Sequence, residues 1–387
     1  MSRVGESATL RVSRRALALK AQGVDLVDFG AGEPDFPSPP VAVAAAQKAL
    51  ADGFTKYTPG SGISPLREAV AARYRERDGA PWTAAQTVIT VGGKAALFEL
   101  AMALVEPGDE VIIPSPRWVS LPAQVELAGG TPVFVETSGD DGFRLHADAL
   151  LAAVTPRTRA ILINAPSNPT GGLIGPEDLA ALVRGAAERG VVVISDETYD
   201  RFVYDGAPPV SAASHAAEFP DTVAVVGSFS KTYAMTGWRL GYVLGPAPLM
   251  SAVEGIQSHM TSNPTSFAMM GALAALDEVT GAEPEVLSMI AAYQERRDYL
   301  IPRLNALPGF VCRPPAGAFY AFPNVAEALG VGREDDVAFA EFLLEKARVA
   351  VVPGSAFGAP GHLRFSYACS LAELERGLDR IAAALAG

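Results

Sequence analysis

Short apolar runs rich in β-branched residues alternate with longer alanine- and leucine-rich segments through most of the chain. The short runs predict strands, and the longer segments have the apolar period of helices. The predicted strands cover residues 87–91, 110–114, 132–136, 159–164, 191–195, 222–226 and 239–244. The predicted helices cover residues 12–22, 41–52, 65–77, 94–105, 176–189 and 285–304, with a last helix from Leu371. This alternation is typical of an α/β protein with a mainly parallel seven-stranded sheet and helices on both faces.

The C-terminal third has a different pattern, which indicates a second domain. A glycine-containing β-like segment at residues 310–322 is followed by helix, strand and helix. The 387 residues suffice for one large and one smaller domain. We expect an N-terminal arm with a small-domain segment at 1–39, a large domain at 40–284 and a small α+β domain at 285–387.

Composition excludes several classes of protein. The formal net charge is −12, and no Lys/Arg cluster interrupts this acidity, which argues against a nucleic-acid or membrane partner. We see no signal peptide and no apolar run of membrane-spanning length. The two cysteines cannot form a disulfide framework, and the four histidines lack metal-ligand spacing, so we expect no metal. A cytoplasmic location is the expectation.

Unusual residues gather where the predicted strands end, and ligands of open parallel sheets lie beyond the carboxyl ends of strands. Gly92, Gly93 and Lys94 follow the first strand and open a helix. Backbone N–H groups at such a helix N-terminus suit a phosphate, although a tight strand-to-helix turn alone would explain the glycines.

Lys231 follows another strand and is surrounded by hydroxyl residues. It ends the sequence Ser228-Phe-Ser230-Lys231, and Arg239 comes eight residues later. A lysine there suits a Schiff base with a cofactor aldehyde, while the two serines and Arg239 suit the phosphate of that cofactor. Without further context, a lysine is more often a solvated surface residue than a catalytic one.

Two further strand ends carry polar side chains. Asn168 stands between two prolines that would fix its amide for a bond to a phenolate oxygen, or it belongs to an ordinary polar loop. Asp196 ends a buried strand, where a carboxylate needs a partner such as a pyridinium N–H, unless it caps a following helix. Tyr199 is placed to reach the same ring oxygen as Asn168. Trp118 could stack on a flat ring, although packing is the commoner role of such an aromatic.

Seven motifs together resemble one family. They are Gly32-Glu-Pro-Asp-Phe36, Lys56-Tyr-Thr58, Gly92-Gly-Lys94, Asn168-Pro-Thr-Gly171, Ser195-Asp-Glu-Thr-Tyr199, Ser228-Phe-Ser-Lys231 and Gly237-Trp-Arg239. In this order and spacing, over residues 7–364, the chain resembles the fold type I pyridoxal-phosphate enzymes. The resemblance is to the class I aminotransferases of the aspartate aminotransferase family, in particular the bacterial aspartate/prephenate subgroup.

The resemblance implies a role for each matching residue. Lys231 would form the Schiff base and then move a proton, Asp196 would pair with the pyridine nitrogen, and Tyr199 with Asn168 would hold the ring oxygen. Trp118 would stack on the ring. The implied phosphate ligands are Gly92, Gly93, Lys94, Ser228, Ser230 and Arg239, with Tyr57 reaching over from the partner subunit of a homodimer.

The resemblance also implies a substrate site. Arg364 would grip the substrate α-carboxylate, assisted by the Gly32 backbone and Asn168. Lys94, Ser7 and Thr9 match residues that contact a distal carboxylate, which favours an acidic amino acid over an apolar one. A lysine at a helix start that extends to solvent is the alternative for Lys94.

Two departures from the subgroup pattern concern the substrate pocket. Arg117 stands where the subgroup usually has tyrosine, and the loop at residues 258–263 also differs. The expected reaction is transfer of an amino group to 2-oxoglutarate or another 2-oxo acid by a ping-pong route. The alternatives are a C–S lyase, decarboxylase or oxidase of the same fold, an aminotransferase for aromatic or alanine-type substrates, and a cofactor-sensing transcription regulator.

Overall fold

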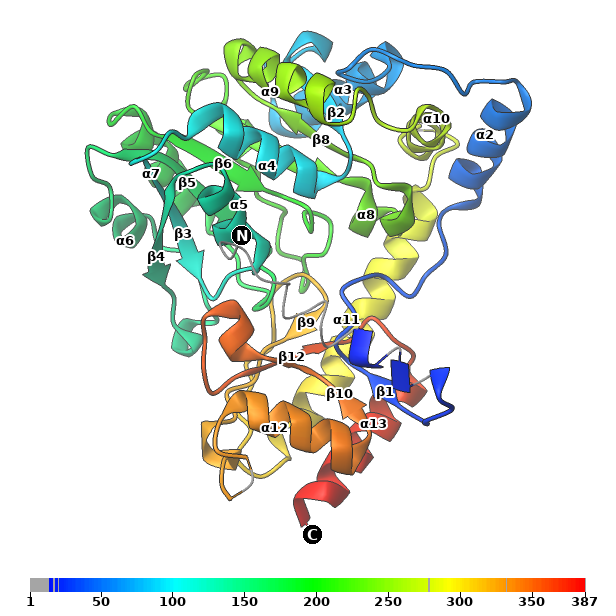
Figure 1. Cartoon of the computed structure of the whole chain (residues 1–387), viewed down its shortest axis with the longest axis vertical. Coiled ribbons are helices and arrows are strands. Elements are labelled where there is room, and N and C mark those ends of the chain that lie inside the picture. Colours follow the sequence, from blue (N-terminus) through cyan, green and yellow to red (C-terminus); the bar gives the residue numbers. More distant parts are fainter. Residues whose placement is uncertain (1–13, 17, 20, 278, 332, 387) are drawn as a thin grey trace.

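A seven-stranded sheet forms the centre of the larger part of the molecule in a computed structural model that describes residues 14–386 apart from 17, 20, 278 and 332 (Figure 1). The strands are β2 (Thr87–Thr90), β3 (Glu110–Ser115), β4 (Thr131–Glu136), β5 (Thr158–Asn164), β6 (Val192–Asp196), β7 (Val223–Ser228) and β8 (Gly241–Leu244). Their order is β2-β8-β7-β6-β5-β3-β4, and β8 alone within this sheet runs antiparallel to its neighbours. The expected mainly parallel seven-stranded sheet is confirmed.

Alternate side chains of every strand except the partly exposed edge strand β4 enter two separate hydrophobic layers, so both faces of the sheet are covered. On β3, Val111 and Ile113 pack into the layer that includes Leu97 and Leu100, whereas Ile112 packs into the opposite layer. The first face is covered by α4 (Gly93–Leu104), α5 (Ser120–Leu127) and α9 (Ala247–Met260). The second face is covered by α3 (Ser64–Asp78), α6 (Ala147–Ala152), α7 (Pro176–Ala187) and α10 (Ser266–Ala275), with α2 (Pro40–Ala51) packed on α10. Buried strands that face helices on both sides explain the apolar runs in the sequence.

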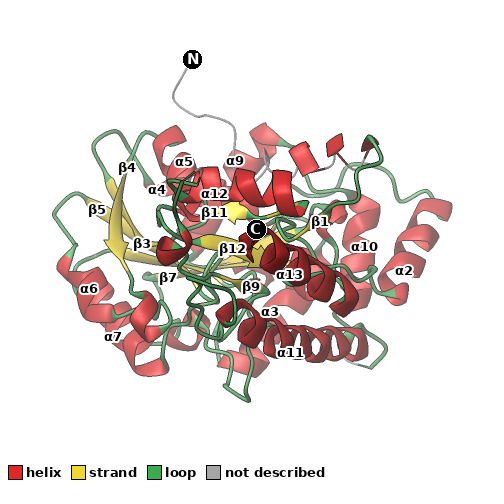
Figure 2. Cartoon of the chain, turned by 90° about the horizontal axis from the view of Figure 1, so that it is seen from below, coloured by secondary structure: helices red, strands yellow, loops and turns green. Residues whose placement is uncertain are grey.

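A third hydrophobic layer belongs mainly to the C-terminal part of the chain, which lies below the sheet in Figure 1. Its helices are α11 (Glu283–Asn305), α12 (Asp336–Phe342) and α13 (Leu371–Ala386). Its strands are β9 (Tyr320–Ala321), β11 (Val352–Pro353) and β12 (Leu363–Ser366), which form a small antiparallel sheet in the order β11-β12-β9, and β10 (Val349–Ala350), which pairs with β1 (Val27–Asp28). The arrangement of helices around these short strands is visible in Figure 2.

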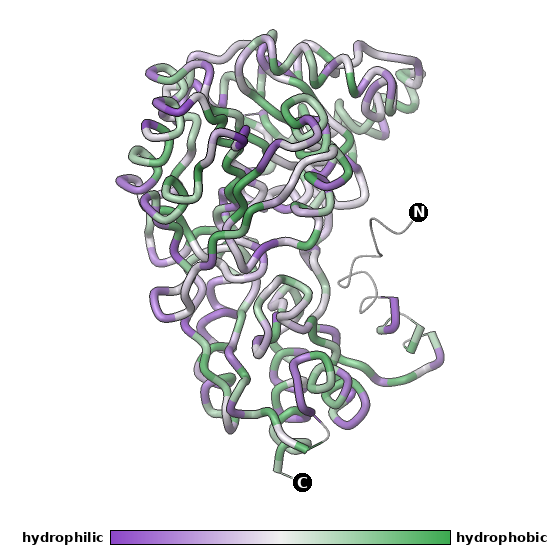
Figure 3. Tube along the Cα trace, turned by 60° about the vertical axis from the view of Figure 1, so that its left-hand side comes forward, coloured by the Kyte–Doolittle hydropathy of each residue, from purple (hydrophilic) through white to green (hydrophobic). Residues whose placement is uncertain are grey.

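Hydropathy follows this layering. In Figure 3 the hydrophobic stretches concentrate in the interior of each part, while hydrophilic positions occur mostly on outer turns and helices. No helix among the described residues is long and apolar enough to cross a membrane. Within the same residues, no group of three His, Cys, Asp or Glu side chains is arranged to hold a metal ion.

The two parts meet at the carboxyl ends of the parallel strands. The segment after β1 contacts both, since the Phe29 N–H donates to Ala350 O at 2.9 Å and Ser38 Oγ donates to Ala234 O at 2.9 Å. This junction is where the sequence analysis placed the candidate site.

Candidate active site

A cavity of about 420 Å³ lies between the carboxyl ends of the sheet and the smaller part of the molecule. It brings together twelve of the predicted site residues. They are Gly32, Gly93, Lys94, Trp118, Asn168, Asp196, Tyr199, Ser228, Ser230, Lys231, Arg239 and Arg364. Segments more than 300 residues apart in the sequence therefore contribute to one cavity.

Lys231 enters the cavity from α8 (Phe229–Thr232), the single helical turn that follows β7. Its Nζ donates a hydrogen bond to Gly32 O at 2.5 Å. Burial lowers the pKa of Lys231 to about 8, and the cations Arg239, Arg364 and Lys94 act in the same direction. A lysine that loses its proton near neutral pH is suited to attack an aldehyde.

Asp196 ends β6 and is buried in the wall of the cavity. The Thr198 N–H donates to its Oδ1 at 3.2 Å. Burial nevertheless raises the pKa of Asp196 to about 6, because among the described residues no cation lies close enough to offset the desolvation. A cationic group placed against this carboxylate would reverse that shift, as a protonated ring nitrogen would.

The other end of the cavity is built to hold an anion. Gly93 begins α4, so the backbone N–H groups at the start of this twelve-residue helix point toward the cavity. Gly92 has φ of 83°, and a Cβ atom there would lie 2.5 Å from Arg239 Nη2, so only glycine lets the arginine approach the turn. Ser228 and Ser230 line the same end, with the Ser230 N–H donating to Ser228 Oγ at 3.1 Å.

Arg364 lies on β12 and is only 2% exposed, opposite the sheet. Its Nη1 donates to Asn168 Oδ1 and its Nη2 to Gly30 O, both at 2.9 Å. Its Nε is buried and has no hydrogen-bond partner among the described residues. Asn168 is fixed in turn by its own N–H, which donates to Asn164 Oδ1 at 2.9 Å.

Tyr199 lies beside a second tyrosine that the sequence analysis did not identify. The hydroxyl groups of Tyr199 and Tyr320 are 2.8 Å apart, and both rings are buried. Tyr320 begins the short strand β9 of the smaller part and lies under the Arg364 guanidinium, whose Cζ is 4.4 Å from the ring centroid. It therefore links the predicted ring-oxygen ligand to the predicted carboxylate ligand.

Trp118 and Lys94 face each other across the cavity wall. Lys94 Nζ lies 4.8 Å from the Trp118 ring centroid, within cation–π distance. Burial and the nearby Arg239 lower the pKa of Lys94. Trp118 also packs against the hydrophobic layer around Leu97, so it has a packing role as well as a surface in the cavity.

Four predicted residues are not brought into this cavity. Gly92 contacts Arg239 from the turn below it, and Tyr57 is 88% exposed and does not line the cavity. Ser7 and Thr9 lie outside the described residues. Arg117, the departure from the subgroup pattern, also does not line the cavity; its Cζ lies 3.4 Å from the Phe134 ring centroid.

Several cavity residues were missed by sequence reasoning. Glu33 accepts a hydrogen bond from Thr236 Oγ1 at 2.8 Å and raises the pKa of Lys231, against the effect of burial. Glu33 lies inside the motif Gly32-Glu-Pro-Asp-Phe36, so this motif could have indicated it as a cavity residue. For Tyr320, the preceding glycine-containing segment was the only sequence signal of a place in the cavity. Its position depends on how the two parts of the molecule pack together. The remaining missed lining residues are Asp28, Gly30, Ala31, Leu97, Asn164, Thr198 and Thr236.

The residues present fit pyridoxal phosphate. A buried carboxylate without a cationic partner, a lysine with a lowered pKa and a glycine cradle under an arginine occupy one cavity. These groups match the charge of a pyridinium nitrogen, the reactivity of an aldehyde and the charge of a phosphate, respectively. Fold and site together define a pyridoxal-phosphate enzyme of fold type I.

Comparisons with known proteins agree with this class. The family model described as aminotransferase class I and II matches residues 24–381. The chain is 44% identical to an aspartate aminotransferase of Geobacillus stearothermophilus, over 97% of this chain and 95% of the relative. It is also 44% identical to a probable aspartate/prephenate aminotransferase of Aquifex aeolicus, over 100% of this chain and 97% of the relative.

A solved structure gives the same result. The aspartate aminotransferase from Thermus thermophilus with maleate superposes with a TM-score of 0.93 at 43% identity, covering 98% of this chain and 97% of that one. The chain therefore belongs to the class I and II aminotransferase family, and it is a pyridoxal-phosphate-dependent transaminase.

Proposed function

We propose that this transaminase moves the amino group of an acidic L-amino acid, with aspartate as the first candidate, to 2-oxoglutarate or a similar 2-oxo acid by a ping-pong route. One observation carries the proposal: Lys231, Asp196 and Arg364 line a single cavity that also holds the exposed Lys94 ammonium. When bound, pyridoxal phosphate supplies the aldehyde that takes up the amino group and the ring that withdraws electrons from the substrate α-carbon.

The proposed roles follow from the position of each side chain. Lys231 would carry the cofactor, and its amine, once free, would move the proton between the substrate α-carbon and the C4′ carbon of the cofactor. Asp196 stays ionised beside the ring nitrogen and keeps that nitrogen protonated. Tyr199 and Asn168 hold the ring oxygen, and Trp118 covers the ring face.

The Arg364 fork is the proposed anchor of the substrate α-carboxylate. Its partners Asn168 and Gly30 fix the orientation of the guanidinium, and its buried Nε has no hydrogen-bond partner among the described residues. A carboxylate opposite the fork would form charge-assisted bonds to this buried cation.

Lys94 is the proposed contact for a second carboxylate. Its ammonium is on the cavity wall beside Trp118, so a short dicarboxylate held by Arg364 has a cation available for its distal end. The Thermus relative was solved with maleate, a four-carbon dicarboxylate, which supports this choice. Ser7 and Thr9 remain predicted contacts outside the described residues.

We further propose a cytoplasmic homodimer with shared sites, and a division into segments 1–39, 40–284 and 285–387. The exposed Tyr57 supports the dimer, because its predicted phosphate contact requires a second copy of the chain. The separate hydrophobic layer of the C-terminal part supports the domain division. The net charge of −12 supports the absence of nucleic-acid and membrane partners.

The first test compares the unaltered chain with Lys231→Ala. The unaltered protein should show a visible cofactor band that L-aspartate converts without any oxo acid, and Lys231→Ala should lose both the covalent cofactor and turnover. Turnover retained by Lys231→Ala would overturn the assignment of Lys231. Release of pyruvate and ammonia without amino transfer would favour the lyase alternative instead.

The substrate choice is tested with Lys94→Gln. This variant should lower kcat/KM for L-aspartate by about tenfold or more, the effect of one charge-assisted bond, and leave L-alanine almost unchanged. An equal loss for both amino acids would remove Lys94 from the substrate site.

A further inference from the structure

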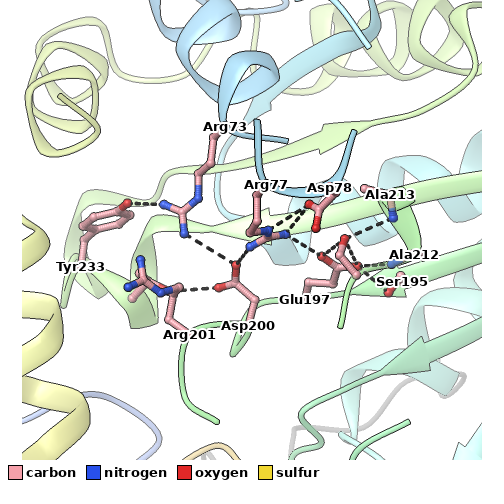
Figure 4. Close-up of polar contacts among 12 residues, drawn as sticks. Arg73, Arg77, Asp78, Ser195, Glu197, Asp200, Arg201, Ala212, Ala213 and Tyr233 are labelled. Carbon is pink, nitrogen blue, oxygen red and sulfur yellow. Dashed lines mark hydrogen bonds and ion pairs between the residues drawn. The ribbon is translucent and has the colours of Figure 1, made fainter. Parts of the chain in front are cut away.

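A buried network of charged side chains lies against the segment that runs from Asp196 to Asp200 (Figure 4). Asp196, Thr198 and Tyr199 line the cavity, but Glu197 and Asp200 do not. They contact instead two arginines from α3, the helix that covers the second face of the sheet. The network therefore lies directly behind the cavity wall.

Glu197 anchors the start of this segment. Its N–H donates to Val226 O on β7 at 2.8 Å. Its carboxylate accepts from Ser195 Oγ and from the Ala212 N–H, both at 3.0 Å, and from Ser211 Oγ at 2.8 Å. Glu197 thus holds β6 in place on both sides of Asp196.

Asp200 joins the other end of the segment to the helix that carries Lys231. Arg77 Nη1 donates to Asp200 Oδ2 at 2.7 Å, which fixes the carboxylate. Thr232 Oγ1, one residue beyond Lys231, donates to Asp200 Oδ1 at 3.4 Å. Both Thr232 and Asp200 are buried.

A second route reaches the same helix end through Arg73. Arg73 Nη1 donates to the Tyr233 hydroxyl at 2.5 Å, and Arg73 Nη2 lies 3.7 Å from Asp200 Oδ2. Asp200 is the group that both routes share. Neither Thr232 nor Tyr233 lines the cavity.

We propose that Asp200 is a positioning residue that fixes the Lys231 helix relative to Asp196. The inference rests on the proposed roles of Lys231 and Asp196. A cofactor attached at Lys231 and paired at Asp196 is held by two separate segments, and the Asp200–Thr232 bond ties those segments together. Without that hydrogen bond, the helix that carries Lys231 and the segment that carries Asp196 can move apart. The cofactor could then not be attached at Lys231 and paired with Asp196 at the same time.

A neighbouring ion pair provides a control. Arg201 Nη1 donates to Glu283 Oε2 at 2.9 Å and joins the same part of the chain to α11, but among the described residues neither side chain hydrogen-bonds a residue of α8. Glu283→Gln removes a charge pair of similar type without changing the connection between Asp200 and Thr232.

The experiment uses Thr232→Val, which removes the hydroxyl at nearly constant volume, and Thr232→Ser, which keeps it. Apoprotein of each variant is titrated with pyridoxal phosphate, and the pH midpoint of the visible band is measured on the loaded protein. Thr232→Val should weaken cofactor binding by about tenfold, the effect of losing one bond to a charged group, and shift the midpoint. Thr232→Ser and Glu283→Gln should match the unaltered protein in both measurements.

The outcomes separate this inference from the proposed function. An unaltered chain that forms no visible band contradicts the roles of Lys231 and Asp196 themselves. An unaltered chain with a normal band, and Thr232→Val with the same affinity and midpoint, overturns the role of Asp200. Equal effects of Thr232→Val and Glu283→Gln would mean that the network contributes only to general stability. This outcome would also overturn the positioning role of Asp200. Asp200→Asn, where it folds, should repeat the result of Thr232→Val.

Discussion

The environment of the Lys231 amine decides when this residue can react. Three other cations, Arg239, Arg364 and Lys94, face the same buried cavity, and only Glu33 opposes them. Burial and these cations favour the neutral amine. The side chain that is proposed to act as a nucleophile is therefore held close to its neutral form.

Capture of the cofactor by apoprotein should consequently depend on pH. Since the pKa of Lys231 is lowered to about 8, the fraction of neutral amine and the capture rate should rise as pH increases from 7 to 9. Stopped-flow absorption after mixing with pyridoxal phosphate measures this rate. Glu33→Gln removes the carboxylate that favours the protonated amine, so its midpoint should move to lower pH. A midpoint near that of free lysine would contradict the assigned burial.

The site residues that the sequence could predict are those that follow strands along the chain. Lys231, Asp196 and Asn168 each lie within five residues after the end of an apolar run, and parallel strands deliver such residues to one edge. Tyr320 could not be predicted in this way, because it reaches the cavity only through packing of the smaller part on the sheet. Asp200 shows the same limit, since its partners lie on α3 and α8.

Helix α4 contains a buried carboxyl group that the function does not use. Glu99 is 0% exposed, and neither of its carboxylate oxygens has a hydrogen-bond partner among the described residues. Burial raises the pKa of Glu99 to about 7. Because the folded protein binds this proton more tightly than the unfolded chain, ionisation of Glu99 opposes folding above that pH.

Replacement of Glu99 by methionine should therefore stabilise the protein in a pH-dependent manner. The unfolded carboxyl ionises first as pH rises, so the stability of the unaltered protein should fall from about pH 4.5 to about 7 and stay low above that range. Glu99→Met should lose this fall and gain about 2–3 kcal/mol in the free energy of unfolding at pH 8, given the size of the shift.

Urea denaturation of apoprotein at pH 5 and pH 8 provides the measurement. Glu126→Met changes an exposed glutamate on α5 and should alter stability by no more than about 0.5 kcal/mol at either pH. Equal stability of Glu99→Met and the unaltered protein at pH 8 would mean that Glu99 has a partner in solution.

Strands of the central sheet were predicted within two residues of their bounds, because burial on both faces leaves an apolar run in every strand except the partly exposed edge strand β4. The strands of the smaller part were not predicted with this accuracy. The β-like segment at 310–322 contributes only β9 (Tyr320–Ala321), and β1, β10 and β11 are two residues long. Such short strands exist through distant pairing partners, which no local pattern specifies.

At the scale of the whole molecule, one face carries exposed aromatic and apolar side chains near Tyr57, the predicted phosphate contact of a partner subunit. Tyr57 is 88% exposed, and Phe54 and Met260 are also exposed. Ser266 Oγ donates to Phe54 O at 2.9 Å, and Gln257 Nε2 donates to Gly60 O at 2.6 Å, so the loop at 54–60 lies against the end of α9 and the start of α10. A second copy on this face would cover these side chains.

We therefore expect a homodimer whose cofactor affinity depends on Tyr57. Light scattering should give twice the chain mass of 40.3 kDa, and Tyr57→Phe should weaken binding of pyridoxal phosphate about tenfold through loss of one bond to the phosphate. Tyr299→Phe, a change on α11, is the matched control and should leave the affinity unchanged. A monomer with normal cofactor affinity would contradict the shared site.

Pairing of the N-terminal segment with the C-terminal part sets the order in which the site can appear during synthesis on the ribosome. The Val27 N–H donates to Arg348 O at 3.0 Å, and the Ser366 N–H donates to Phe29 O at 2.7 Å. Strand β1 thus has no place to dock until more than 300 further residues have been translated. The central sheet can gather its strands as they emerge, but the Gly30 contact of Arg364 closes only after residue 364 leaves the exit tunnel. A nascent chain that has already built its sheet therefore still lacks the proposed carboxylate site at Arg364.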